Sequence, residues 1–466
     1  MESLKTEILV IGSGPGGAVT ACTLSEAGRD VLVIEEGSSL AVESCRPFSV
    51  EEMELKYRNG GLTFALGAPK INYVEGKVVG GGSEVNAGLY HRTPAPILER
   101  WAKEFQLRAS SEKEMLPHFE ECERDLSVSL SSEPFAPSSL KLKEGTERLG
   151  WKVIEAPRWY KGAERQSMSR TLIPRTLQAG GKLLSDTRVL SLKQVQNAWE
   201  VRVKNKDGAT TTVSAQHVFV CAGAIQTPGL LLRSGIRHNI GKSFQLHPTI
   251  KVFAEFEDDV NFEGMGVPVH QVKEFSPDMS FGCSISSPPF LALGLLDHPG
   301  GGLNLQERWK KMATYYAMIT PTGKGTIRSV PGFGDPLVQF KLSTRDHENL
   351  VIGLKRLSLA LLQAGAKRLY PSVYNLPVAS SSADVDAWAS SMSLKRASLM
   401  TIHLFSSCPM GENKKVTAVD SFGRVHDLSG LYISDASILC TAPGVNPQGS
   451  VMAFAKRNAL KFLGRL

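Results

Sequence analysis

A glycine-rich turn between an apolar run and a helical pattern constrains this chain more than any other feature. Residues 7–11 read EILVI, an apolar run typical of a parallel strand that is buried on both faces. Gly12, Gly14 and Gly17 follow with the spacing G-x-G-x-x-G, and residues 18–27 favour a helix. This order predicts a βαβ unit in which a tight turn joins the first strand to the first helix.

Each glycine has a mechanical role in such a turn. Gly12 permits the turn, Gly14 lets the backbone approach a pyrophosphate, and Gly17 lets the helix pack closely on the strand. The phosphates would lie at the helix N-terminus, where free N–H groups and the helix dipole favour an anion. Gly28 ends the helix, and Glu35 ends the second strand, where its carboxylate can accept hydrogen bonds from ribose hydroxyls.

The pattern therefore predicts a dinucleotide site rather than a turn without a ligand. FAD and NAD both use this motif, so the turn alone does not separate them. The sequence holds no second complete copy, which favours one bound nucleotide.

Composition excludes several classes of protein. The 466 residues carry a net charge of +7 without basic blocks and are 42% hydrophobic, which argues against disorder and gives little reason to expect nucleic acid. No apolar stretch approaches the roughly 18 to 20 residues that span a membrane. The seven scattered cysteines form no C-x-x-C pair and no secretory signal precedes residue 7, so we expect a cytoplasmic protein without disulfides or a metal site.

The chain is too long for one ordinary core, so two domains are expected. The fold class is α/β: a Rossmann-like domain built from residues 1–248 and 395–466, with insertions from the other domain at about 100–170. Residues 249–394 would form a substrate-binding domain on a mainly antiparallel sheet with helices, among them a helix over 349–364. The apolar residues 288–293 would be a core strand or the lining of a lipid or sterol pocket.

Further motifs resemble the glucose-methanol-choline (GMC) oxidoreductase family. Both ends of the chain and much of the middle are covered, and the spacing is most similar to cholesterol oxidases and long-chain alcohol oxidases. The segments that carry the resemblance are 78–88 (VVGGGSEVNAG), 221–236 (CAGAIQTPGLLLRSGI), 403–411 (HLFSSCPMG), 430–437 (GLYISDAS) and 444–447 (GVNP). The family implies FAD as the cofactor.

The triple glycine at 80–82 offers bare backbone that can lie against a flat ring or a phosphate, with short polar groups beside it. A strand-to-helix turn that needs positive φ would also explain the glycines. The family resemblance implies that Gly81, Ser83 and Asn86 contact the flavin. Relatives with a covalent flavin anchor use a histidine near this segment, and its absence here predicts non-covalent FAD.

The remaining cofactor residues also come from the resemblance. Val189 resembles the position whose backbone holds the adenine. Asp435 would hold sugar or ribityl hydroxyls, although a helix-capping role is equally consistent with its spacing. Asn446 as N-cap and Pro447 as first residue predict a helix whose positive end would face the flavin pyrimidine. His247, before a proline, is interpreted as a turn residue that links the two domains.

The resemblance assigns catalysis to His403 and Asn446. Oxidation of CH–OH to a carbonyl needs a base at the hydroxyl, and a neutral imidazole suits that role. His403 alone, among apolar neighbours, would be interpreted as a buried structural histidine; the matching block favours catalysis. We therefore expect FAD-dependent oxidation of a small-molecule alcohol, with dioxygen or another acceptor. A lyase of the hydroxynitrile lyase type and a redox-silent flavin-binding protein stay open as alternatives.

Overall fold

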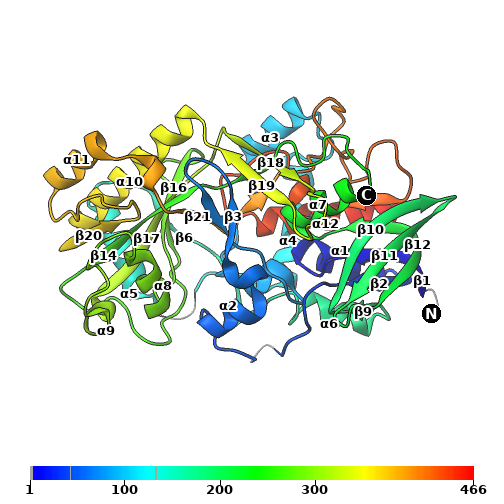
Figure 1. The fold of residues 1–466 in the computed structure, drawn as a ribbon, viewed down its shortest axis with the longest axis horizontal. Helices are drawn as coiled ribbons and strands as arrows, with labels where there is room; N and C mark the ends of the chain where they lie inside the picture. The colour runs from blue at the N-terminus through cyan, green and yellow to red at the C-terminus, as the bar shows by residue number, and fades with distance from the viewer. Residues whose placement is uncertain (1–3, 42–43, 132–133) are drawn as a thin grey trace.

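The computed structural model describes residues 4–41, 44–131 and 134–466, and two large sheets organise it (Figure 1). The first sheet, on the right of Figure 1, follows the order β10-β11-β12-β1-β2-β9, with β23 paired to β12. Its strands are β1 (Leu4–Ile11), β2 (Val31–Ile34), β9 (Lys182–Leu184), β10 (Thr187–Val195), β11 (Ala198–Asn205), β12 (Thr210–Val220) and β23 (Leu431–Ile433).

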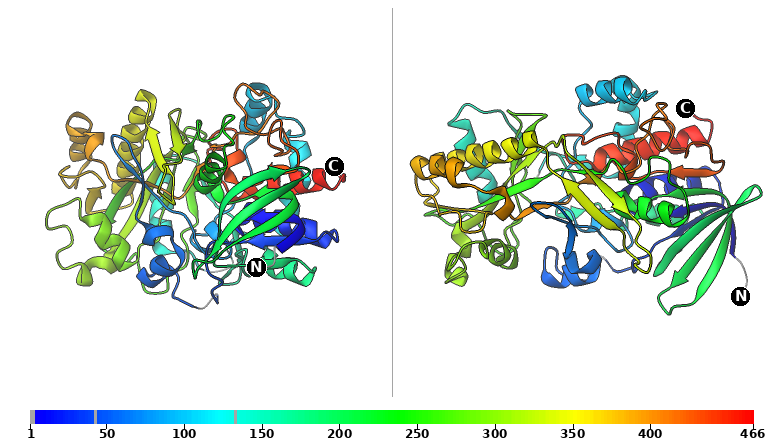
Figure 2. Two further views of the ribbon diagram at one scale, coloured as in Figure 1. Left: turned by 45° about the vertical axis from the view of Figure 1, so that its right-hand side comes forward. Right: turned by 45° about the horizontal axis from the view of Figure 1, so that its top comes forward.

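Parallel pairing forms the centre of the first sheet. β1 pairs in parallel with β2 and β12, and the end of β12 pairs in parallel with β23. Helices α1 (Pro15–Glu26) and α12 (Gln448–Phe462) pack side by side against this sheet (Figures 1 and 2). The predicted βαβ unit is confirmed, and Gly28 follows α1 with φ of +80°.

The second sheet follows the order β3-β4-β21-β14-β17-β16-β15-β6, with β20 paired to β14. It is mainly antiparallel, as expected, although β4 and β21 pair in parallel. Helix α10 (Thr344–Gln363) packs on β14 and β17. The strands are β3 (Thr63–Ala65), β4 (Ile71–Tyr73), β6 (Val153–Glu155), β14 (Thr249–Glu255), β15 (His270–Val272), β16 (Met279–Cys283), β17 (Met312–Ile319), β20 (Arg368–Pro371) and β21 (Leu399–Thr401).

The chain passes between the two sheets at two neighbouring places, and these two segments position the site. β13 (Gln245–Leu246) leads into β14, and β21 leads into β22 (Leu404–Phe405). β13 and β22 pair antiparallel with each other, and the backbone N–H of His247 lies 3.3 Å from the carbonyl oxygen of His403. The sheet geometry therefore brings together two histidines that are 156 residues apart.

Three local expectations need correction. The helix expected over 349–364 begins at Thr344, because Ser343 and Asp346 form a capping box. Residues 288–293 form neither a strand nor part of the pocket described below, since they lie in helix α8 (Pro288–Leu295), which packs on Phe253. The last helix begins at Gln448 with Pro447 as its N-cap, one position later than expected.

The remaining helices and strands connect and cover the sheets. They are α2 (Val50–Lys56), α3 (Ala95–Glu104), α4 (Glu112–Asp125), α5 (Pro137–Glu147), α6 (Leu172–Gln178), α7 (Gly223–Arg233), α9 (Leu305–Arg308), α11 (Ser382–Ser391), β5 (Val128–Ser129), β7 (Arg158–Lys161), β8 (Glu164–Arg165), β18 (Lys324–Arg328) and β19 (Leu337–Lys341), with short 3₁₀ turns that include η2 (Gly81–Glu84) and η5 (Ala436–Ile438). Among the described residues, no helix is long and apolar enough to cross a membrane. All seven cysteines are free and buried.

Candidate active site

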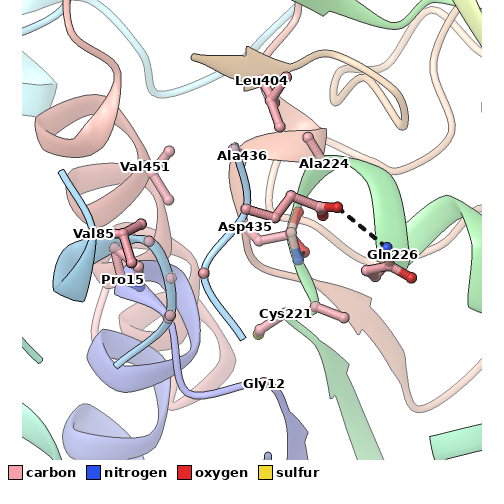
Figure 3. A pocket seen from close by; sticks show the side chains of 18 of the residues that line it. Gly12, Pro15, Val85, Cys221, Ala224, Gln226, Leu404, Asp435, Ala436 and Val451 are labelled. Carbon is pink, nitrogen blue, oxygen red and sulfur yellow. Dashed lines mark hydrogen bonds between the residues drawn. The ribbon is translucent and has the colours of Figure 1, made fainter. Parts of the chain in front are cut away.

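A long pocket runs from the glycine turn to the catalytic candidates and encloses about 1580 Å³ of space, its open mouth included. Figure 3 shows Gly12, Val85, Cys221, Asp435 and Val451 around this one space, although they come from distant parts of the chain. Most of the residues selected from the sequence line it: Gly12, Gly14, Glu35, Gly81, Asn86, Val189, His403, Asp435, Asn446 and Pro447. Gly17 and Ser83 are absent from the lining.

The glycine turn leaves one end of the pocket free of side chains. Gly12 has φ of +102°, and a Cβ there would collide with the backbone of Cys221. A Cβ on Gly17 would collide with the carbonyl of Gly12, so this glycine lets α1 pack on the strand. Gly14 has no neighbour closer than 3.9 Å to such a Cβ, and no side chain caps α1 after it. Exposed N–H groups at this helix start suit a phosphate.

The 81–86 segment lies against the glycine turn. Gly81 has φ of +55°, and a Cβ on it would lie 2.8 Å from the Cα of Gly14. Ser83, fully buried, donates its hydroxyl to the carbonyl of Gly80 at 2.7 Å and accepts from the N–H of Met168 at 3.0 Å. The structure therefore gives Ser83 the role of holding the loop.

Asn86 and Glu35 line the pocket while making contacts of their own. Asn86 Nδ2 donates to Gln448 Oε1 at 2.8 Å, which ties its loop to α12. Glu35 Oε2 accepts from the N–H and hydroxyl of Ser13 at 2.9 and 2.7 Å, and Oε1 accepts from the N–H of Gly37 at 2.8 Å. Burial raises the pKa of Glu35. Each carboxylate oxygen keeps acceptor capacity for a ribose hydroxyl.

Asp435 joins the starts of two helical segments. Its Oδ2 accepts from Gly223 N–H at 2.9 Å and from the Thr227 hydroxyl at 2.5 Å, while Oδ1 accepts from the N–H of Ser437 at 2.8 Å. The capping role is thus present, and the carboxylate also lines the pocket. Burial raises the pKa of Asp435.

The structure brings His403 and Asn446 together. Nε2 of His403 lies 3.2 Å from Nδ2 of Asn446, and both residues line the pocket. His403 follows β21 and is 9% exposed, while Asn446 lies just before α12. Burial, and then the charge of Lys273, lowers the pKa of His403 to about 3. The imidazole is therefore neutral at pH 7 and holds a lone pair for a proton.

His247 was missed as a site residue by reasoning from the sequence. It is fully buried, and its Nδ1 lies 3.1 Å from Nδ1 of His403, while Gly444 N–H donates to its Nε2 at 3.3 Å. Burial, with the charges of His403 and Lys273, lowers the pKa of His247 well below its usual value. No sequence spacing connects positions 247 and 403, and only the pairing of β13 with β22 shows the contact.

The contacts of this histidine pair define two proton arrangements. When Gly444 donates to Nε2 of His247, the proton of His247 lies on Nδ1 and is donated to Nδ1 of His403. The proton of His403 then lies on Nε2, next to Asn446. In the other arrangement His403 carries its proton on Nδ1 and donates to His247, so that its Nε2 holds a lone pair and accepts from Nδ2 of Asn446, but the Gly444 bond is lost. In the first arrangement Nε2 of His403 and Nδ2 of Asn446 are both donors and form no hydrogen bond.

Gln271 supports Asn446 from β15 and was also missed. Its Nε2 donates to Oδ1 of Asn446 at 3.3 Å and to the hydroxyl of Tyr316 at 3.2 Å. These contacts, with the His403 contact, explain why Asn446 does not cap α12: its amide is held by side chains instead. A polar residue in the middle of a short strand is the signal that could have indicated it.

The residues present fit a dinucleotide with a flavin ring. The starts of α1, α7 and α12 all contribute lining residues, and each start carries partial positive charge that suits an anion. Gly14 and Gly81 leave room that a Cβ would fill. Among the described residues, no group of three or more His, Cys, Asp or Glu side chains could hold a metal ion.

Comparison with known proteins agrees with this geometry. GMC oxidoreductase family profiles match residues 53–249 and 321–455, and an NAD(P)-binding Rossmann-like domain matches residues 10–69. An uncharacterized GMC-type oxidoreductase of Sinorhizobium fredii is 38% identical, over 98% of this chain and 94% of that protein. The chain belongs to the GMC oxidoreductase family, a class of flavin oxidoreductases.

More distant relatives share the fold across nearly the whole chain. A long-chain-alcohol oxidase of Arabidopsis thaliana is 26% identical, over 97% of this chain and 67% of its own length. Among solved structures, pyridoxine 4-oxidase from Mesorbium loti superposes with a TM-score of 0.79 at 20% identity, covering 98% of this chain and 99% of that one. At this identity the likeness concerns the fold.

Proposed function

We propose that this protein oxidises an alcohol to a carbonyl with FAD as hydride acceptor, and that dioxygen or another acceptor then takes the electrons. One observation carries the proposal: a neutral imidazole and a carboxamide lie 3.2 Å apart on the wall of a pocket suited to a dinucleotide. The likeness to a long-chain-alcohol oxidase supports it.

Specific residues would hold the cofactor. The start of α1 with Gly14 would bind the pyrophosphate, Glu35 the ribose, and the backbone at Val189 the adenine. Gly81 and Asn86 would lie along the flavin, and the start of α12 at Pro447 would stabilise negative charge on its pyrimidine. When bound, FAD supplies a ring that accepts a hydride.

His403 would take the hydroxyl proton at Nε2 as the hydride leaves the carbon. This requires the arrangement in which His403 carries its own proton on Nδ1 and donates it to His247. The cost is the bond between Gly444 and His247, about 1 kcal/mol. Asn446 would hydrogen-bond the same substrate oxygen and fix its orientation, and Gln271 holds Asn446 in place.

We infer that FAD binds without a covalent link. The segment 81–86 reads GGSEVN and offers no histidine or cysteine to anchor the ring. Denaturation and filtration should therefore release the yellow cofactor from the protein. Colour that stays with the unfolded chain would contradict this inference.

The decisive experiment removes the base. His403→Ala should keep the yellow cofactor but lose anaerobic bleaching of the flavin by an alcohol that bleaches the native protein. His347→Ala, on α10, is the matched control and should bleach normally. Normal bleaching in His403→Ala would refute the base assignment.

The same assay separates the alternatives. A lyase of the hydroxynitrile lyase type would cleave its substrate while the flavin stays oxidised. A redox-silent binding protein would show neither reaction across a broad alcohol panel. Repeating positive reactions with oxygen and with quinone dyes would identify the electron acceptor.

We also propose the division of the chain into a cofactor unit, residues 1–248 and 395–466, with insertions at about 100–170, and a substrate unit, residues 249–394. The two sheets support this division, and β6 lies in the second sheet as the insertion requires, although β3, β4 and β21 also carry segments of the first unit into that sheet. The seven free cysteines support a reducing, cytoplasmic setting.

A further inference from the structure

One charged side chain beside the catalytic pair lacks a counter-charge. Nζ of Lys273 is shielded from water and makes no hydrogen bond or ion pair with any residue that the structure describes. Both ring nitrogens of His91 and Oε1 of Gln271 are also buried without a hydrogen bond of good geometry, although the two side chains interact with each other. These atoms form a polar cluster that the proposed chemistry does not use.

The register of the second sheet places this cluster against the site. Gln271 lies on β15 and reaches Asn446. Lys273 follows the end of β15, and its N–H still donates to the carbonyl of Lys152 at 2.9 Å, so the extended pairing continues and puts its side chain on the same face as Gln271. Gly282 on β16 pairs with both Gln271 and Tyr316, and the Tyr316 ring covers this glycine so that its hydroxyl meets Gln271.

The charge of Lys273 acts on the histidines of the site, although Lys273 itself is not among the residues that line the pocket. Its charge lowers the pKa of His403, of His247 and of His91. Burial lowers the pKa of Lys273 itself to about 8, so the amine remains mostly protonated at pH 7. His403, His247 and His91 are the titratable groups that interact with it; an imidazole is neutral or positively charged, so none of the three supplies a negative charge.

A buried ammonium without a partner is costly, because burial removes its water without replacing the lost interactions. Among the described residues, none accepts a hydrogen bond from the Lys273 ammonium, so this cost is not offset. The flexible four-carbon stem lets the ammonium move toward a ligand while β15 stays in place. The missing negative charge would then come from the molecule that binds beside His403 and Asn446.

We propose that the alcohol substrate carries a carboxylate, which pairs with Lys273 and accepts a hydrogen bond from His91, while its hydroxyl meets His403 and Asn446. This inference rests on the proposed alcohol oxidation and adds the substrate class: hydroxy acids rather than neutral alcohols. Gln271, which contacts Asn446 and precedes Lys273 by two residues, would lie between the two ends of the substrate.

The test compares two matched series, ω-hydroxycarboxylates and 1-alkanols of about three to eight carbons. At one chain length or more, the hydroxycarboxylate should bleach the flavin of the native holoenzyme with a kcat/KM about tenfold or more above that of the matched alkanol. Lys273→Met should remove this advantage, since methionine keeps the length without the charge.

Lys251→Met is the matched control. Lys251 lies on β14, on the same face as its pairing partner Tyr316, and burial likewise lowers its pKa to about 8. It is three strands from Lys273, about 14 Å at ordinary strand spacing, and alters the pKa of none of the three histidines. The advantage of the hydroxycarboxylates should persist in this variant.

A binding readout separates this inference from the proposed function. Tryptophan-monitored melting of the holoenzyme should show stabilisation by hydroxycarboxylates in the native protein and in Lys251→Met, and none in Lys273→Met. Stabilisation without bleaching by either series would contradict alcohol oxidation but support the carboxylate site. Equal responses to both series in the native protein, or an unchanged preference in Lys273→Met, would overturn the carboxylate site.

Discussion

The neutral state of His403 has a measurable consequence for stability. Its pKa is about 3 in the folded protein and about 6.5 in an unfolded chain. Below about pH 6.5 His403 therefore binds a proton in the unfolded chain but stays unprotonated in the folded protein. The free energy of unfolding falls as the pH falls toward the folded pKa. Between about pH 7 and pH 5 this one group should remove about 2 kcal/mol from the free energy of unfolding.

Urea unfolding of the FAD-saturated protein at the two pH values measures this loss. His403→Gln lacks this imidazole, so the decrease in the free energy of unfolding between pH 7 and pH 5 should be smaller by about 2 kcal/mol. His347→Gln is the control and should keep the native pH dependence. The variant is compared with itself across pH, which removes any constant cost of the substitution.

Equal pH dependence in the native protein and in His403→Gln would refute the reasoning. It would mean that the imidazole takes up a proton at the same pH in the folded protein as in the unfolded chain, so that burial does not hold it neutral as the pH falls. The burial of His403 beside Lys273 would then have to be offset by a contact that the structure does not contain.

Three further substitutions test separate parts of the site. His247→Phe should keep FAD but slow anaerobic bleaching by about 100-fold, measured by stopped flow, because His403 loses the partner that holds its Nδ1; an unchanged rate would show that the pair is only structural. Asn446→Ser should also lose bleaching while melting normally, since Asn446 contacts His403 instead of capping α12; full turnover would assign it a structural role. Gly81→Ala should weaken FAD binding, followed by flavin fluorescence, because the new Cβ would lie 2.8 Å from Gly14; native affinity would show that the two loops adjust. The hydroxycarboxylate preference should decline as the pH rises through about 8, where Lys273 loses its charge beside the neutral His91, His247 and His403.

The sequence by itself determined the cofactor end of the protein. The turn at Gly12, Gly14 and Gly17, the apolar strand before it and the helix after it are neighbours in the chain. The hydrophobic periodicity and the glycine spacing of this short segment are therefore sufficient to predict the βαβ unit. The resemblance then named His403 and Asn446, which the structure brings to 3.2 Å.

Local signals did not show which groups hold the predicted site residues. Ser83 and Asp435 were selected as cofactor contacts, but spacing could not show that Ser83 is held by Gly80 and Met168, or that Asp435 links α7 to η5. The first residue of a helix depends on which group satisfies the free N–H groups at its start. A capping box makes α10 begin earlier than predicted, and α12 begins one position later than predicted because Asn446 is held by side chains.

Only the tertiary structure decided what surrounds the proposed catalytic pair, His403 and Asn446. His247 reaches His403 because β13 pairs with β22, and Gln271 reaches Asn446 from β15, with Lys273 two residues further along the chain. These contacts join residues more than 100 positions apart. The hydrophobic pattern of one strand does not show which distant strand it pairs with. The residues proposed to react could be predicted along the chain, whereas their hydrogen-bond partners and the buried Lys273 ammonium near them are seen only in the packed fold.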